Sequence, residues 1–247
     1  MALLLFDVGN SRLKFALWKN KQLGKVHAVP YTRPDLLHIL QEHFGSETAF
    51  DGVYVSNVAG AEVQQTIIQY FSDRQVDCLF ARSAANFGGL VNAYINPEQL
   101  GVDRWLAMIS VSQCFSGPFC VVDCGTAITI DAVGLNGHHL GGFILPGVAS
   151  MKTAINDSAE SIRLSELERP IGMFGRNTSQ AVSNGIIQSI VALIEKSFYA
   201  LEQECGTKVT CVLSGGDAEL IKHALPFTVD VETNLVLKGL AINFGLS

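Results

Sequence analysis

The same short pattern ends two apolar runs that lie about half a chain apart. It consists of an Asp, any residue, a Gly and then a small polar side chain, and it occurs in Leu3–Ser11 and again in Phe119–Thr126. Four apolar residues before each Asp suit a strand that is buried on both faces, and the Gly allows the chain to reverse. Apolar alternation resumes after each turn. The sequence therefore predicts two similar β-hairpins with polar tips.

Each hairpin tip offers groups that suit a metal-bound polyphosphate. In the first copy, the turn after Asp7 supplies backbone N–H groups, the side chains of Asn10 and Ser11, and the ammonium of Lys14. Backbone donors and an ammonium suit the terminal phosphates of ATP, whereas Asp7 would act on Mg²⁺ through water. One copy alone is better interpreted as a plain hairpin. The second copy, at Asp123, favours the phosphate site.

Composition and charge exclude several classes of protein. The chain has 247 residues, of which 48% are apolar and 16% charged, and its net charge is −6, which disfavours nucleic-acid binding. No apolar run approaches the roughly 20 residues needed to cross a membrane, and the N-terminus does not resemble a signal peptide. The six cysteines include no C-x-x-C pair and complete no zinc spacing with the histidines. We expect a cytoplasmic protein with reduced thiols and neither nucleic-acid nor membrane partners.

Strands alternate with helices along the chain, which predicts an α/β fold. The best boundary is near Ser116–Pro118, giving an N-terminal lobe over 1–117 and a C-terminal lobe over 118–247. Further strands are expected over 21–29, 52–58, 76–80, 141–146 and 209–213, and helices over 34–44, 61–71, 103–115, 178–204, from 148, and from 235. Leu37 is expected in the buried stripe of the first helix. The Gly-, Asn- and Pro-rich loop over 86–101 is a candidate functional segment.

The segment Gly101–Arg104 begins a predicted helix and has two interpretations. In the first, Asp103 caps the helix and Arg104 is solvated. In the second, Asp103 is a general base, Arg104 holds an anionic substrate, and Tyr94 lines the same pocket. The turn Ser214–Asp217 could similarly receive a flat ligand such as adenosine, or be an ordinary strand-to-helix turn. The residues alone leave these alternatives open.

Taken together, five segments resemble the type III pantothenate kinases, in the family's order along the chain. They are Asp7-x-Gly9-Asn10-Ser11-x-x-Lys14, Leu100-Gly101-x-Asp103-Arg104, Asp123-x-Gly125-Thr126-Ala127, Gly141-Gly142-x-Ile144-x-Pro146-Gly147 and Arg176-Asn177-Thr178. Ser11 stands where the family often has Thr, which keeps the hydroxyl. The resemblance implies two similar lobes of the acetate kinase, sugar kinase, Hsp70 and actin superfamily, a duplicated ribonuclease H-like fold around an ATP cleft.

The resemblance also implies a role for each matched residue. The ATP-binding positions would be Asp7, Val8, Gly9, Asn10, Ser11, Arg12, Leu13, Lys14 and Thr126. The pantothenate-binding positions would be Tyr94, Gly101, Val102, Asp103, Arg104 and Thr178, with Asp103 as proton acceptor. Asp123 would bind a monovalent cation, K⁺ or NH₄⁺, beside ATP and Mg²⁺. The reaction would be phosphorylation of pantothenate to 4′-phosphopantothenate, the first step of coenzyme A biosynthesis.

Two other functions remain open, as does the assembly. The chain could phosphorylate another small hydroxy acid, or it could be a non-catalytic regulatory relative of the family. The helix over 178–204 carries apolar residues on differing sides, among them Ile186, Ile187, Val191 and Leu193. We therefore expect a homodimer in which the partner helps to close the pantothenate pocket near Thr178. The alternative is a central helix buried within its own lobe.

Overall fold

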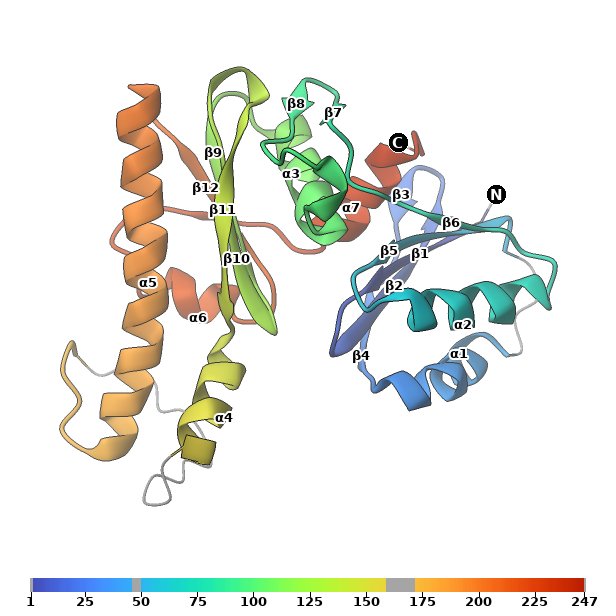
Figure 1. Cartoon of the computed structure of the whole chain (residues 1–247), viewed down its shortest axis with the longest axis horizontal. Helices are drawn as coiled ribbons and strands as arrows, with labels where there is room; N and C mark the ends of the chain where they lie inside the picture. Colours follow the sequence, from blue (N-terminus) through green and yellow to red (C-terminus); the bar gives the residue numbers. More distant parts are fainter. Residues whose placement is uncertain (1, 46–49, 159–171, 247) are drawn as a thin grey trace. The chain divides into compact units, whose positions relative to one another are not determined.

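The chain folds into two compact units in a computed structural model that describes residues 2–45, 50–158 and 172–246 (Figure 1). The first unit comprises Met1–Cys114 and Asn234–Ser247, and the second comprises Phe115–Thr233. The division near residue 115 lies close to the expected boundary, but residues 234–247, expected in the second lobe, belong to the first unit.

The closing helix explains this difference. Helix α7 (Leu235–Asn243) packs against α3 (Val102–Cys114) and against strands of the first sheet. Gly239 lies so close to α3 that an added Cβ would stand 1.9 Å from the carbonyl oxygen of Leu106. Six of the nine residues of α7 are buried, so sequence periodicity does not identify the unit that covers it.

The first unit is built on a mixed sheet with the strand order β3-β2-β1-β5-β6, with β4 also paired to β2. The strands are β1 (Leu3–Val8), β2 (Arg12–Lys19), β3 (Gln22–Leu23), β4 (His27–Pro30), β5 (Gly52–Asn57) and β6 (Cys78–Phe80). Strand β1 is antiparallel to β2 and parallel to β5, which confirms the first predicted hairpin. The single strand expected over 21–29 is instead the two short strands β3 and β4.

Helices cover both faces of this sheet. On one face, α1 (Leu36–Phe44) and α2 (Ala61–Ser72) pack over a core that contains Phe6, Phe15 and Phe71. On the other face lie α3 and α7. Leu37 is 55% exposed, so its expected burial is wrong. The buried face of α1 follows the spacing of Leu36, Ile39, Leu40 and Phe44, and Leu37 lies outside it.

The second unit repeats the strand order of the first. Its sheet runs β11-β10-β9-β12-β13, with β10 antiparallel to β9 and β12 parallel to β9. These strands are β9 (Phe119–Cys124), β10 (Ala127–Val133), β11 (His139–Pro146), β12 (Thr210–Ser214) and β13 (Asp230–Val231). In both units the first strand of the hairpin pairs with the second strand on one edge. On its other edge lie two further strands that run parallel to it. The expected duplication is therefore present in the topology.

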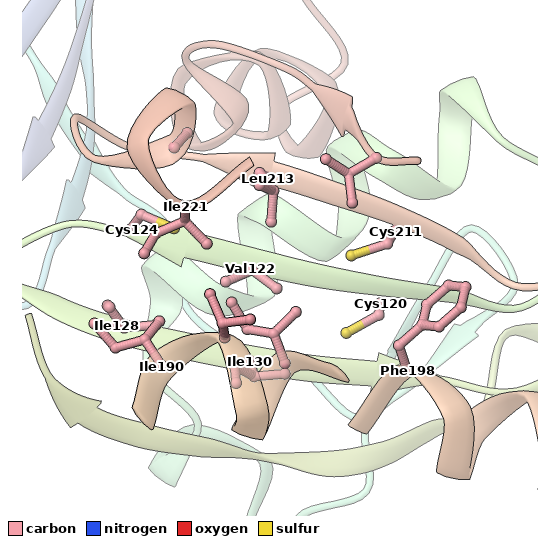
Figure 2. Close-up of a cluster of buried hydrophobic side chains, with 14 of the residues drawn as sticks. Cys120, Val122, Cys124, Ile128, Ile130, Ile190, Phe198, Cys211, Leu213 and Ile221 are labelled. Atoms are coloured by element: carbon pink, nitrogen blue, oxygen red, sulfur yellow. The ribbon is translucent and has the colours of Figure 1, made fainter. Parts of the chain in front are cut away.

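One long helix contributes more side chains to the second core than any other element does (Figure 2). Helix α5 (Thr178–Cys205) packs on β9 and β10, and α4 (Val148–Ser158) and α6 (Ala218–Lys222) contact α5. Ile186, Ile187 and Val191 are buried in the structure of the single chain and Leu193 is half-buried. Burial of these residues therefore needs no second subunit, and the homodimer stays a prediction.

Buried thiols contribute to the same core. Cys120 and Cys211 are register partners on β9 and β12, and both are buried, as is Cys124. Buried free thiols of this kind pack as small apolar side chains. Within the described residues, no helix is long and apolar enough to span a bilayer.

Candidate active site

The tip of the first hairpin joins buried anchors to an exposed polar turn. Gly9 N donates to Arg12 O at 3.1 Å and closes the turn between β1 and β2. Val8 and Leu13, on either side, are fully buried, so a ligand at this tip would meet their backbone only. The side chains of Asn10, Ser11 and Arg12 are exposed. The tip thus presents backbone and side-chain hydrogen-bonding groups on a rigid base.

An ion pair lies at the base of this tip. Asp7 and Lys14 are register partners on β1 and β2, and Lys14 Nζ lies 3.8 Å from Asp7 Oδ2. The carboxylate is nearly buried, whereas the ammonium is about one-third exposed. Lys14 therefore stabilises the Asp7 carboxylate and still reaches the surface where an anion would arrive.

Tyr31 supports the turn from outside the motif. Its hydroxyl donates to Gly9 O at 2.8 Å, and its backbone N–H donates to Ser11 O at 3.2 Å. Burial raises the pKa of Tyr31, and nearby Arg33 opposes this shift. The phenol therefore remains a hydrogen-bond donor. Sequence analysis missed Tyr31, since nothing in the residues around it signals a contact 22 positions away.

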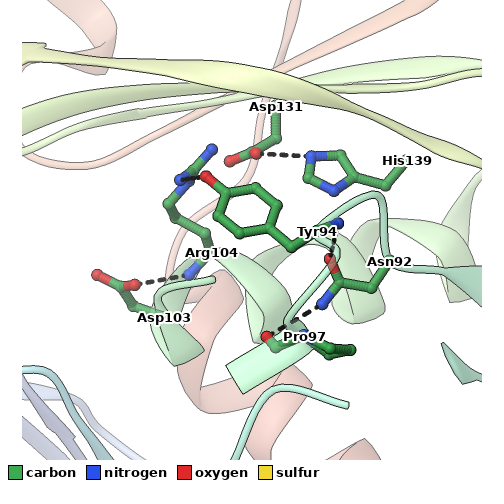
Figure 3. Close-up of polar contacts among 7 residues, drawn as sticks. All are labelled: Asn92, Tyr94, Pro97, Asp103, Arg104, Asp131 and His139. Atoms are coloured by element: carbon green, nitrogen blue, oxygen red, sulfur yellow. Dashed lines mark hydrogen bonds and ion pairs between the residues drawn. The ribbon is translucent and has the colours of Figure 1, made fainter. Parts of the chain in front are cut away.

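The predicted acceptor residues Tyr94 and Arg104 are in contact (Figure 3). Arg104 Nη1 donates to Tyr94 OH at 3.1 Å, and the guanidinium carbon lies 5.9 Å from the ring centroid. Arg104 is only 5% exposed, so the solvated interpretation of this residue is wrong. A guanidinium has five N–H donors in a fixed plane and is suited to a carboxylate.

Asn92 and Ser83 hold the segments that carry this pair. Asn92 Nδ2 donates to Ala84 O and Pro97 O, and its Oδ1 accepts from Tyr94 N at 3.0 Å. Ser83 Oγ donates to Leu100 O at 2.8 Å. Sequence analysis missed both residues. Asn92 could have been predicted, because an Asn side chain in a loop often accepts a hydrogen bond from the backbone N–H two residues later and so forms a turn.

Asp103 lies in the first turn of α3 rather than at the cap position outside it. Helix α3 begins at Val102, and Asp103 Oδ1 accepts from Arg104 N at 2.8 Å. A Cβ on Gly101 would stand 2.6 Å from Asp103 Oδ1, so the glycine leaves room for the carboxylate. The N-terminus of a helix favours a negative charge. A carboxylate in this position, beside Arg104, suits a proton acceptor.

The second hairpin tip is supported by the segment Pro146–Gly147. Gly147 N donates to Thr126 O at 2.9 Å, and Ser150 Oγ donates to the same oxygen at 3.0 Å. An added Cβ on Gly147 would stand 2.2 Å from Gly125 O. The residues of the segment Gly141–Gly147 alone did not predict a role for it. In the structure its last residue, Gly147, lies close to the backbone of the hairpin tip.

The turn Ser214–Asp217 adjoins the same tip. Gly215 has φ +92°, and its Cβ would stand 2.5 Å from Asp123 Oδ1 and 2.4 Å from Cys124 O. Asp217 N donates to Cys124 O at 3.1 Å. Burial raises the pKa of the Cys124 thiol, and the carboxylates of Asp123 and Asp217 raise it further. Two segments that the sequence shows 90 residues apart therefore form one oxygen-rich corner in the second unit.

Thr178 is the first residue of α5. The helix cap is Asn177, whose Oδ1 accepts from Gln180 N at 2.8 Å. Thr178 is exposed and is not used as the cap. It belongs to the second unit, whereas Tyr94 and Arg104 belong to the first.

The carboxylates at the two tips suit hard cations that arrive with a ligand. No group of three or more His, Cys, Asp or Glu side chains gathers into a metal site within residues 2–45, 50–158 and 172–246. Mg²⁺ is commonly bound by one or two carboxylates together with phosphate oxygens and water. Asp7 fits this donor set as a single carboxylate. The buried His139 instead lies 3.0 Å from Asp131 Oδ1 and joins β10 to β11 (Figure 3).

Solved structures share the arrangement of this chain. A Campylobacter jejuni protein described as a candidate Baf family transcriptional activator superposes with a TM-score of 0.63 at 22% identity, covering 98% of both chains. A candidate 2-dehydro-3-deoxygalactonokinase from Sinorhizobium meliloti gives 0.59 at 12% identity, covering 98% of this chain and 97% of that one. At such identities the likeness concerns the fold. It agrees with the repeated strand order, and the expected sugar kinase-type fold is confirmed.

Sequence comparison identifies the family. The family described as type III pantothenate kinase matches residues 3–199. A type III pantothenate kinase from Nitrosococcus oceani is 33% identical over 245 residues, covering 97% of this chain and 92% of the relative. The matched stretch contains both hairpin tips, the Tyr94–Arg104 pair and Thr178. The chain therefore belongs to the type III pantothenate kinase family.

Proposed function

We propose that this chain transfers the γ-phosphoryl group of ATP to the primary hydroxyl of pantothenate. The product is 4′-phosphopantothenate, and the reaction is the first step of coenzyme A biosynthesis. Family membership supports the reaction, and the buried Arg104 in contact with Tyr94, next to Asp103, is the observation in the structure that carries it. Phosphoryl transfer requires mainly positioning and charge neutralisation, and this chain's residues are suited to both.

The first hairpin binds the phosphates of ATP in this proposal. The turn from Asp7 to Lys14 contributes its backbone N–H groups, the side chains of Asn10 and Ser11, and the Lys14 ammonium. Asp7 would hold Mg²⁺ through its waters, and the ion would supply neutralisation of the phosphate charge when bound. Thr126, at the second tip, also contacts ATP. Its carbonyl accepts from Gly147 N and Ser150 Oγ, which fixes the position of this residue.

The acceptor loop binds pantothenate and receives the proton. Arg104 holds the carboxylate of pantothenate through its guanidinium, and Tyr94 fixes the guanidinium plane. Gly101 and Val102 line the same site through their backbone. Asp103 orients the primary hydroxyl and accepts its proton as the oxygen attacks the γ-phosphorus. Thr178 is the remaining pantothenate-binding residue of the proposal, near which the partner chain of the proposed homodimer helps to close the pocket.

Asp123 binds a monovalent cation, K⁺ or NH₄⁺, in this proposal. The register partner of Asp123 on β10 is Thr129, whereas Asp7 has Lys14 at the corresponding position. A carboxylate near a buried strand end favours a positive charge beside it. An external cation supplies at the second tip the charge that Lys14 supplies at the first.

The proposal includes a cytoplasmic homodimer. The six cysteines include no C-x-x-C pair, and Cys120 and Cys211 lie among apolar core residues, which supports a reducing compartment such as the cytoplasm. A dimer would place the partner's surface near Thr178. Mixing an Asp103→Asn chain with a Thr178→Arg chain tests it: recovered activity supports a shared pocket, and no recovery after verified subunit exchange contradicts it.

A coupled assay of ADP release tests the reaction. Pantothenate should support turnover with ATP, Mg²⁺ and K⁺, and a panel of other small hydroxy acids should support much less. Mass spectrometry should detect 4′-phosphopantothenate. Turnover with another hydroxy acid but not with pantothenate would identify a different kinase, and no turnover with any acceptor would favour a regulatory relative.

A further inference from the structure

One hydroxyl of the first unit is buried without a hydrogen-bond partner among the described residues. Ser56 is 0% exposed, and its Oγ contacts no donor or acceptor there. Buried polar groups in proteins are nearly always satisfied, and an exception usually marks a strained, catalytic or ligand-completed position. Ser56 therefore requires an explanation.

The strand register places Ser56 beside the carboxylate of the first hairpin. Strand β5 runs parallel to β1, and Ser56 is the register partner of Asp7. On the other side of β1, the partner of Asp7 is Lys14. An ammonium, a carboxylate and a hydroxyl thus form a row across β2, β1 and β5, which we call the phosphate row.

The alternation of side chains along β5 places the Ser56 hydroxyl on the same face of the sheet as the Asp7 carboxylate. Val53 and Val55 belong to the aromatic core under α1 and α2, so Ser56 and Tyr54 lie on the opposite face. Tyr54 indeed contacts Phe244 at the end of α7. Phe6 and Val8 belong to the same aromatic core, so Asp7 shares the face of Ser56.

Serine is not a residue type that buried strands favour. A β-branched apolar residue, as at the neighbouring Val53 and Val55, would suit a buried strand better and leave no unsatisfied group. The repeat in the second unit also has a serine at this place: Ser214 is the register partner of Asp123. A hydroxyl therefore stands beside the carboxylate in both halves of the duplicated fold.

We propose that Ser56 is a positioning residue for the phosphate site. Its hydroxyl would donate to the neighbouring Asp7 carboxylate when that carboxylate holds the waters of Mg²⁺, and would thereby fix the side of the carboxylate that faces away from Lys14. This inference rests on the proposed function, because Mg²⁺ reaches Asp7 together with ATP. Asp7 is then held from both neighbouring strands while the nucleotide is bound.

The test compares Ser56→Ala with Ser110→Ala. Ser110 lies on α3, is 1% exposed and also has an unsatisfied Oγ within the described residues, but it is not in the phosphate row. Mn²⁺ binding is measured by electron paramagnetic resonance in the presence of a non-hydrolysable ATP analogue. The unfolding temperature of each variant is measured without metal or nucleotide.

Ser56→Ala should weaken Mn²⁺ binding by about 3–10-fold, near the lower end of losses seen for outer-shell partners of metals. Ser110→Ala should bind Mn²⁺ as the wild type does. Neither variant should unfold at a lower temperature, since each removes an unsatisfied hydroxyl. Turnover of Ser56→Ala at low Mg²⁺ should fall, and added Mg²⁺ should restore it.

Equal Mn²⁺ affinities in the two variants would overturn the inference, as would a lower unfolding temperature of Ser56→Ala with unchanged Mn²⁺ binding. The latter result would mean a purely structural hydroxyl. If the wild type binds the ATP analogue and Mn²⁺ and turns over pantothenate, such results refute the role of Ser56 alone. A wild type that binds neither would refute the proposed function as well.

Discussion

The two hairpin tips have the same strand order and the same Asp-x-Gly turn, yet different residues flank the Asp. Lys14 and Ser56 are the register partners of Asp7, and Thr129 and Ser214 are those of Asp123. The serine is repeated and the cation is not. This difference agrees with the proposed roles of the two tips, which are phosphate binding beside Lys14 at the first and binding of an external cation at the second.

The largest expected effect lies outside both tips. Asp103→Asn should lower kcat by about 10²–10⁴, because it removes the proposed proton acceptor. Nucleotide affinity should be nearly unchanged, since in the proposal the phosphates contact the hairpins and not Asp103. Steady-state kinetics and calorimetry with the ATP analogue measure the two quantities. A variant with near-full kcat would mean that the Asp103 carboxylate serves only the start of α3.

Replacing Asp123 should give the next largest loss. Asp123→Ala should reduce turnover by about tenfold or more, because a direct cation ligand matters at least as much as an outer-shell partner. The loss should be the same in K⁺, NH₄⁺ and Na⁺, since the site that distinguishes them is gone. A variant that still prefers K⁺ over Na⁺ would show that the cation binds elsewhere.

The close backbone approach at the second tip predicts a loss of stability. Gly215→Ala should lower the free energy of unfolding by about 1–3 kcal/mol, because φ is +92° and the new Cβ would meet backbone and carboxylate oxygens. Gly185→Ala is the matched control: its Cβ would meet nothing within 4 Å, and it should raise the free energy by roughly 0.5–1 kcal/mol. Denaturant unfolding distinguishes them, and equal effects would contradict the close approach.

The thiol of Cys78, in the first unit, should make the free energy of unfolding depend on pH. Burial raises the pKa of Cys78 to about 12 from 9.0, and the neighbouring Asp77 adds to the shift. The unfolded chain loses this proton above pH 9, whereas the folded chain keeps it to about pH 12. The free energy of unfolding should therefore fall as pH rises through this range. The free energy of unfolding of the Cys78→Ala variant should fall less steeply over the same pH range. Parallel curves for the variant and the wild type would show that this pH dependence does not come from Cys78.

Local patterns predicted the hairpins well, because Asp-x-Gly turns and period-2 alternation are encoded within ten residues. They could not place α7, since a helix that is mostly buried does not show which unit covers it. They left Asp103 and Arg104 ambiguous, and the contact from Tyr94 resolved Arg104. Tyr31 and Ser56 were missed because their roles depend on strands paired across long sequence separations.

The most direct test measures pantothenate-dependent ADP release in K⁺ and in tetramethylammonium, for the wild type, Thr129→Lys and the control Thr129→Met. Thr129→Lys places an ammonium where the first tip has Lys14. We expect the wild type to need K⁺, Thr129→Met to need it equally, and Thr129→Lys to lose much of that need. Wild-type rates that are equal in K⁺ and tetramethylammonium, or no pantothenate-dependent release in either salt, would contradict the account.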